Sequence, residues 1–106
     1  MRILFDQGTP APLRQHLAPH EVETAYERGW STLKNGELLQ AAEDAGFAVL
    51  VTTDMNLKYQ QNLAARRIAI VVLGTTSWPR IRATVEAVML AVERASVGTY
   101  IEVQIP

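Results

Sequence analysis

The sequence predicts an α/β fold, a three-layer α/β/α sandwich around a mostly parallel sheet of about five strands. Two observations support this prediction. Short apolar or alternating segments of strand length are separated by segments of helical periodicity, an order typical of parallel sheets with right-handed crossovers. The chain has 106 residues, 48% of them hydrophobic, and a chain of this size can form one hydrophobic core but not two. We therefore expect a single domain over residues 1–106.

The first half of the chain is expected to contain two strands and two helices. Arg2 to Phe5 is an apolar run that begins the sheet. Thr9, which is followed by proline, is the expected N-cap of a short helix. Residues 21–25 alternate between polar and apolar side chains, as in a short strand. A second helix is expected to have Asn35 as its N-cap and to end at Gly46.

The second half is expected to supply three strands, a long helix and a short helix within the polar, irregular residues 55–67. Residues 48–52 form a continuous apolar run, typical of a strand that is buried on both faces. Residues 68–73 form the most apolar strand, which we expect to be central in the sheet. One helix with an apolar side should follow Pro79 and stop by Gly98. Residues 99–105 alternate between polar and apolar side chains. This pattern indicates an edge strand with one solvent-exposed face, or a strand that pairs with a second protomer.

Composition excludes several classes of site and partner. The chain has no cysteine and two histidines, which excludes disulfides, thiolate chemistry and a His-rich metal site. Its formal net charge of −1 gives no global attraction to nucleic acid, so RNA or DNA would have to bind a local basic patch. No apolar run approaches the roughly 20 residues that span a bilayer, and no signal segment precedes the first strand. We therefore expect a cytoplasmic protein with no membrane partner.

Three acidic residues are the strongest indication of function. Asp6 and Asp54 end predicted strands, and Glu37 opens the helix between them, so all three are expected at the carboxyl edge, where open α/β sheets usually bind ligands. Like charges gathered there repel one another unless a cation or a proton relieves them. Carboxylate oxygens suit Mg²⁺ or Mn²⁺, which can polarise a phosphoryl oxygen and generate hydroxide. We therefore expect Asp6, Glu37 and Asp54 to be metal ligands and catalytic residues.

The alternative interpretation of these acids is structural. An aspartate just past a strand often caps a helix or hydrogen-bonds a turn, and a glutamate in the first turn of a helix gains from the helix dipole. One such acid is most often structural, whereas three at one predicted edge favour a site. The sequence leaves both interpretations open.

Five further residues are candidates for binding a substrate. Lys34, Lys58 and Arg80 follow strands or open helices at the carboxyl edge, where positive charge would be needed for a phosphate backbone. Thr53 and Asn56 flank the second aspartate and are expected to hydrogen-bond it or the substrate, with turn formation as the alternative.

Parts of the sequence resemble the short, uncharacterised PIN-like proteins, which are related to the PIN ribonucleases found as toxins of bacterial toxin–antitoxin pairs. The resemblance rests on three segments in order, Arg2–Asp6, Asn35–Ala42 and Val49–Leu57, and its most specific piece is Thr52-Thr53-Asp54. It implies a parallel sheet flanked by helices, with the three acids coordinating Mg²⁺ or Mn²⁺ for phosphodiester hydrolysis. It also implies RNA as substrate and a cognate antitoxin protein as partner.

The chain departs from the PIN pattern, and two other functions compete with a nuclease. Active PIN nucleases usually show a fourth acid further along, where residues 74–78 here read Gly-Thr-Thr-Ser-Trp. The first competitor is a catalytically inactive PIN-like domain that binds a partner protein or forms a homodimer through residues 100–105. The second is a receiver-like signalling domain, which would also need paired acids at the first strand and a lysine after the fifth. The chain has only Asp6 at the first strand and ends its last strand without lysine.

Overall fold

A computed structural model describes residues 1–57, 62 and 65–106, and in that part of the chain five strands form one sheet. The strands are β1 (Arg2–Phe5), β2 (Glu21–Thr24), β3 (Val49–Thr52), β4 (Ala69–Val72) and β5 (Tyr100–Glu102). Their order is β2-β1-β3-β4-β5, and every neighbouring pair is parallel. The predicted α/β class and the five-stranded parallel sheet are confirmed.

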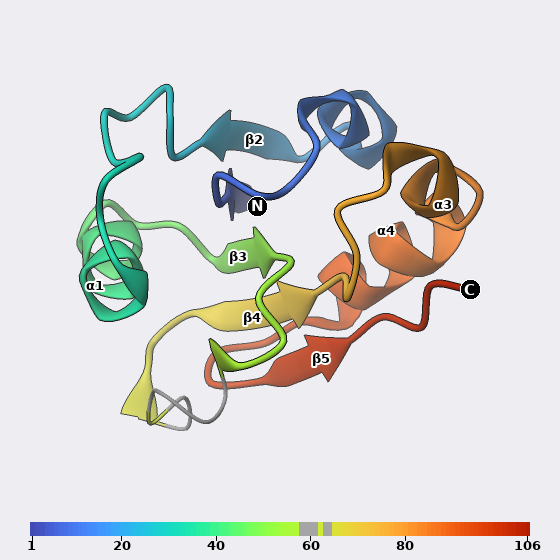
Figure 1. The fold of residues 1–106 in the computed structure, drawn as a ribbon. Coiled ribbons are helices and arrows are strands. Elements are labelled where there is room, and N and C mark those ends of the chain that lie inside the picture. The colour runs from blue at the N-terminus through green and yellow to red at the C-terminus, as the bar shows by residue number, and fades with distance from the viewer. Residues whose placement is uncertain (58–61, 63–64) are drawn as a thin grey trace.

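Helices cover both faces of the sheet. The helices are the 3-10 helix η1 (Ala11–Leu17) and the α-helices α1 (Asn35–Asp44), α3 (Trp78–Arg82) and α4 (Val85–Arg94). Figure 1 shows α1 on one side of the sheet and η1, α3 and α4 grouped on the other. This arrangement is the predicted three-layer sandwich. Within the described residues, no helix has the length and apolar character needed to cross a membrane.

The core consists of one hydrophobic cluster on each face of the sheet. Side chains along a strand point alternately to opposite faces, so a continuous apolar run supplies both clusters. In β1, Ile3 and Phe5 pack with η1, α3 and α4, whereas Leu4 packs with α1. All four residues of β3 and all four of β4 are buried. The continuous runs in the sequence therefore identified the strands that lie between two layers.

Two of the predicted helix caps are wrong. The N-cap of η1 is Pro10, and the hydroxyl of Thr9 instead donates to Asp6 at 2.7 Å. The N-cap of α1 is Lys34, and Asn35 is the first helical residue. Both polar side chains are good caps by type, but each donates a hydrogen bond to an aspartate carboxylate at the edge of the sheet, and a hydrogen bond to a charged acceptor is stronger than one between neutral groups.

The single long helix predicted after Pro79 is instead two helices. The break between α3 and α4 falls at Thr84, whose backbone has φ −127° and ψ 26°. Its hydroxyl donates to the carbonyl oxygens of Arg80 at 3.3 Å and Ile81 at 3.2 Å. Hydroxyl side chains that bond the preceding turn compete with the helical backbone pattern. The helical spacing of the apolar residues continues across this break, so the break could not be predicted from periodicity alone.

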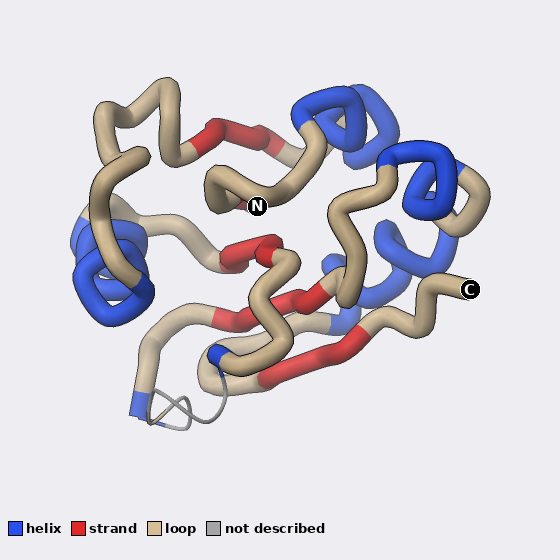
Figure 2. The backbone as a smooth tube through the Cα atoms, in the orientation of Figure 1, coloured by secondary structure: helices blue, strands red, loops and turns tan. Residues whose placement is uncertain are grey.

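The strand positions also differ in detail from the prediction. β4 is an interior strand, but the middle of the sheet is β3. β5 is an edge strand, as predicted, and is shorter than the expected residues 99–105. Its continuation is held by a side chain, because Arg80 donates from Nε to the backbone oxygen of Pro106 at 2.6 Å and from Nη2 to that of Ile105 at 3.1 Å. Figure 2 shows this last segment running out beyond β5 toward α3.

Candidate functional site

The strand order places a topological switch point between β1 and β3. From β1 the chain moves outward to β2, then crosses back to β3 and continues outward to β5 on the other side. Connections that leave in opposite directions open a crevice at the carboxyl ends of the two strands, and ligands of open α/β sheets usually bind there. Asp6 directly follows β1, and Asp54 comes two residues after β3. The two aspartates therefore flank the switch point.

Asp6 is partly buried and is held by hydroxyl and amide donors. Its Oδ1 atom accepts hydrogen bonds from the backbone N of Thr9 at 3.1 Å and from the Thr9 hydroxyl at 2.7 Å. Its Oδ2 atom accepts a short hydrogen bond from the hydroxyl of Thr52. Its backbone N donates to the carbonyl of Val51 at 3.1 Å, which continues the β1–β3 pairing. The carboxylate is therefore fixed against β3.

Asp54 is held from the opposite side of the crevice. Its Oδ2 atom accepts a hydrogen bond from the side-chain amide of Asn35 at 2.8 Å, and its Oδ1 atom accepts one from the backbone N of Asn56 at 2.9 Å. Its backbone N donates to the hydroxyl of Thr52 at 3.1 Å. Because the same hydroxyl donates to Asp6, Thr52 links the two acidic loops, and this residue is only 2% exposed.

Glu37 does not join the two aspartates. It lies in the first turn of α1, where its Oε1 atom accepts a hydrogen bond from the backbone N of Lys34 at 3.2 Å. This bond is the glutamate half of a capping box. Among the described residues, no group of three or more His, Asp or Glu side chains is close enough to share a metal ion. The structure thus joins the loops of Asp6 and Asp54 through Thr52, and the Glu37 side chain bonds the start of its own helix.

The chemistry of the pair still suits a hard divalent cation. A carboxylate offers about four lone-pair positions, and Asp6 accepts hydrogen bonds from three atoms of the described residues while Asp54 accepts from two. Mg²⁺ keeps several waters and is commonly held by one or two carboxylates. Asp6 and Asp54 are therefore the residues that would hold such an ion.

The structure places the predicted substrate-binding residues in different surroundings. Lys34 is exposed beside the first turn of α1, at the same edge as the aspartates, and Lys58 lies outside the described residues. Arg80 anchors the C-terminal segment through its guanidinium group. The backbone of Asn56 forms the turn around Asp54, which is the alternative that the sequence left open.

Gly8 is a site residue that sequence reasoning missed. A Cβ atom at this position would lie 2.6 Å from the hydroxyl oxygen of Thr53, closer than such atoms are found in proteins. The loop after β1 therefore approaches the loop after β3 closely at Gly8 and Thr53. A contact between residues this far apart in the sequence leaves no local signal, so a lone glycine after a strand could not reveal it.

The loop formed by residues 6–8 lines two hollows. One is about 140 Å³ and is lined by Asp6, Trp30 and Asn35 together with neighbouring residues. The other is about 460 Å³ and is lined by the same loop together with Tyr26, Thr76 and further residues. Thr76 belongs to the hydroxyl-rich segment of residues 74–78. Both hollows therefore adjoin Asp6.

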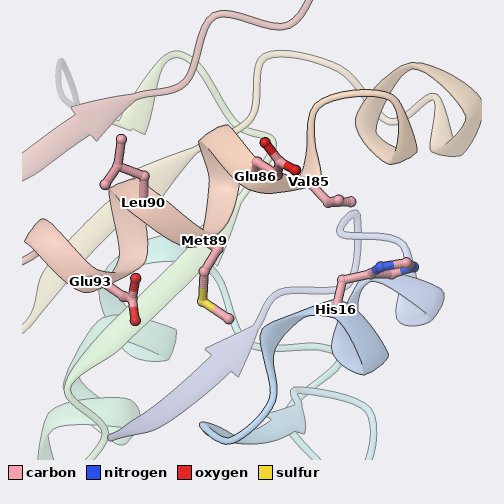
Figure 3. A pocket seen from close by; sticks show the side chains of 6 residues that line it. All are labelled: His16, Val85, Glu86, Met89, Leu90 and Glu93. Carbon is pink, nitrogen blue, oxygen red and sulfur yellow. The ribbon is translucent and has the colours of Figure 1, made fainter.

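A third hollow, of about 390 Å³, lies on the helical side of the molecule. Figure 3 shows its lining, which comes from α4 except for His16 of η1: His16, Val85, Glu86, Met89, Leu90 and Glu93. None of the predicted site residues lies there. Its two glutamates also make it a poor place for a phosphate.

The turn next to the acidic pair contains one carboxyl group with a shifted pKa. Glu27 pairs with Arg14, whose Nη2 atom lies 2.5 Å from Oε1, and Oε1 also accepts a hydrogen bond from the backbone N of Thr24 at 2.9 Å. The Arg14 hydrogen bond, followed by that from Thr24, lowers the pKa of Glu27 below its ordinary value. The ionised form of Glu27 therefore holds the turn in place.

Replacing Arg14 by glutamine should raise the pKa of Glu27 toward its ordinary value. A carboxyl group whose pKa is lower in the folded state stabilises the protein at pH values above its unfolded pKa, and that contribution is lost as the pH falls through the folded pKa. An NMR titration of the Glu27 side chain in both proteins, with unfolding followed over the same acidic range, measures this effect. Identical titration curves for the two proteins would contradict the role of Arg14.

No protein-family model, curated protein or solved structure matches this chain. The candidate site therefore rests on the geometry of the chain's own residues, in which two aspartates at a topological switch point share the hydroxyl of Thr52. The resemblance to PIN-like proteins stays a prediction from the sequence.

Proposed function

We propose that this protein is a metal-dependent ribonuclease that hydrolyses phosphodiester bonds with Mg²⁺ or Mn²⁺ held by Asp6 and Asp54. One observation carries the proposal: the two aspartates flank the switch point of the sheet, and the hydroxyl of Thr52 bonds both the carboxylate of Asp6 and the backbone N of Asp54. The resemblance to PIN-like proteins supports RNA as the substrate and a bacterial toxin–antitoxin pair as the setting, with a cognate antitoxin as partner.

Different residues of the chain would bind the ion, position the acidic loops and contact the phosphate in such a reaction. When bound, a divalent cation polarises a phosphoryl oxygen and lowers the pKa of a water molecule. Asp6 and Asp54 would hold the ion, and Thr52 keeps the two acidic loops in register because its hydroxyl contacts both. The exposed Lys34 would meet phosphate charge at the edge, and Thr76 would orient a phosphate across the larger hollow.

Calorimetry with Mn²⁺ tests the proposal. The wild-type protein should bind the ion, and Asp6→Asn or Asp54→Asn should weaken binding at least tenfold, about 1.4 kcal/mol or more, and abolish cleavage of single-stranded RNA. Glu86→Gln, an exposed acid on α4, is the matched control and should behave as wild type. Glu37→Gln should also bind Mn²⁺ normally, since the carboxylate of Glu37 caps α1.

Two results would contradict the proposal. One is unchanged Mn²⁺ affinity in both aspartate variants, and the other is metal-independent cleavage that persists in them. Weaker binding in Glu37→Gln would instead add the third acid to the metal site, as the sequence predicts.

The second candidate is a catalytically inactive domain that binds a partner protein or a second copy of the chain. The observation in its favour is that Asp6, Glu37 and Asp54 each accept hydrogen bonds within the chain, so they have a structural role without a metal. On this hypothesis calorimetry would show no heat with Mn²⁺. The outer edge of β5, the last strand of the sheet, would then be the contact surface.

A receiver-like domain remains the most distant alternative. The strand order found here is also the order of receiver domains, so the sheet alone does not separate the two functions. The residue after Asp6 is Gln7, and residues 103–106 after β5 contain no lysine. Incubation with acetyl phosphate should therefore leave the intact mass of the protein unchanged.

A further inference from the structure

We propose that Tyr26 is a stacking platform for one base of a single-stranded nucleic acid, next to the bond on which Asp6 and Asp54 act. This inference rests on the proposed function, because it takes nucleic acid as the molecule that reaches the acidic pair. Three features carry it: the rigid turn that holds Tyr26, the exposure of its ring, and the hollow that this ring shares with Asp6.

The turn that carries Tyr26 is fixed by hydrogen bonds on both sides of the residue. The backbone N of Ala25 donates to Phe5 at 2.8 Å, which attaches the turn to the end of β1. The backbone N of Gly29 donates to the carbonyl of Tyr26 at 3.0 Å, and Gly29 has a φ of 75°, a conformation that favours glycine. Glu27 closes the turn, since its backbone N donates to the hydroxyl of Thr24 at 3.1 Å.

The ring of Tyr26 is nevertheless open to solvent. The residue as a whole is 77% exposed, the largest exposed fraction among the large hydrophobic residues of the described chain. A rigid backbone beneath an exposed aromatic ring is a preorganised stacking surface, because little conformational entropy is lost when a flat ligand covers it. Trp30, at the end of the same turn, differs: it packs edge-on against Phe47 at 6.2 Å and lies under the guanidinium of Arg28 at 4.7 Å.

The hollow beside Tyr26 connects this residue to Asp6. It holds about 460 Å³, within the range of small-ligand sites. Asp6 and Gly8 line one part of it, and Thr24 and Thr76 add hydroxyl groups that could bond the polar edge of a base. A base on Tyr26 would therefore place its own sugar and phosphate toward Asp6.

The charges of the chain support base stacking as a source of affinity for nucleic acid. The net charge is −1, and two arginines near the site already have partners, Arg14 with Glu27 and Arg80 with the carbonyl oxygens of the last two residues. These two arginines are therefore less available for phosphate contacts, so a contribution that does not depend on charge would add to the affinity. Stacking on an aromatic face is independent of charge and tolerates any base, so the occupant expected here is a base of single-stranded RNA or DNA.

Binding of adenosine 5′-monophosphate, followed by NMR, tests the platform separately from hydrolysis because this nucleotide has no internal phosphodiester bond. Wild-type protein should bind it with shifts centred on the Tyr26 ring, and ribose 5-phosphate, which lacks the base, should give no such shifts. Tyr26→Ala should weaken binding about fivefold to a hundredfold, the range expected for one stacked base. Tyr26→Phe keeps the ring and should bind as wild type.

A matched control comes from another exposed apolar residue. Leu90, which is 47% exposed on α4 and lines the hollow of Figure 3, can be replaced by alanine without touching the acidic edge. Leu90→Ala should leave nucleotide binding unchanged. Equal affinity of wild type and Tyr26→Ala for adenosine 5′-monophosphate would overturn the inference.

The two proposals fail in different ways. If Mn²⁺ binding and RNA cleavage are absent but Tyr26 still binds the nucleotide, hydrolysis is wrong and the platform stands. If cleavage depends on Asp6 and Asp54 while Tyr26→Ala keeps a wild-type KM for single-stranded RNA, the platform is wrong and hydrolysis stands. A raised KM with unchanged kcat in Tyr26→Ala, together with cleavage that depends on the aspartates, supports both.

Discussion

Thr52→Val should lower the free energy of unfolding by about 1–3 kcal/mol, the cost of leaving buried hydrogen-bonding groups unpaired. Valine has nearly the shape of threonine, so the change removes the hydroxyl and leaves the packing of β3 intact. That hydroxyl donates to Asp6 and accepts from the backbone N of Asp54, and Thr52 is only 2% exposed. Chemical denaturation of the two proteins measures the difference.

Thr52→Ser is the matched control for this prediction. Serine keeps the hydroxyl and loses one buried methyl group, so it should cost about 0.5–1.5 kcal/mol, as removal of one methyl group from a core usually does. Thr52→Val should also weaken Mn²⁺ binding, since Asp6 and Asp54 would lose the group that links their loops, whereas Thr52→Ser should not. If valine proved as stable as wild type, the hydroxyl would have no role in joining the two loops.

Gly8→Ala should destabilise the protein by about 1–3 kcal/mol, the usual cost of forcing an extra carbon into a packed site. The new Cβ atom would lie 2.6 Å from the hydroxyl oxygen of Thr53, so one of the two loops must move. Threonine is branched at Cβ, which restricts its χ1 angle and limits how far its hydroxyl can rotate away. The free energy of unfolding, obtained from denaturant titration, measures the cost.

A double mutant tests whether the contact with Thr53 causes the destabilisation by Gly8→Ala. Thr53→Ala removes the oxygen that the new carbon would meet and leaves the Thr53 Cβ atom at 4.0 Å, an ordinary contact distance. The variant with both changes should therefore be more stable than Gly8→Ala alone, which gives a favourable coupling energy in a double-mutant cycle. Purely additive effects would mean that the contact between Gly8 and Thr53 does not limit the approach of the loops.

Residue patterns predicted the strands well where burial alone determines them. β1 has the bounds expected from its apolar run, and β3 and β4 lie within one residue of theirs at each end, because strands covered on both faces need apolar side chains at every position. The end of β5 was overestimated. Residues 103–105 keep the alternation of a strand, but the segment is held by Arg80, a contact that periodicity cannot show.

Patterns failed where a polar side chain had a choice of partners. Thr9 and Asn35 have the side chains of good helix caps, and the sequence contains no information on which hydrogen-bond partner lies nearer in space. In the folded chain each donates to an aspartate at the edge of the sheet. Glu37 shows the reverse, since a glutamate in the first turn was a candidate metal ligand and acts as a cap within its own helix.

The sequence by itself determined the α/β class, the parallel sheet and the placement of Asp6 and Asp54 at its carboxyl edge, because strand burial and side-chain alternation are local properties of the chain. Only the tertiary structure decided that Thr52 joins the two aspartates, that Gly8 touches Thr53, and that Tyr26 stands exposed beside the same loop. The first two of these contacts join residues about forty-five positions apart. They form when two strands pair in one register, and a register is fixed by the packing of the whole sheet.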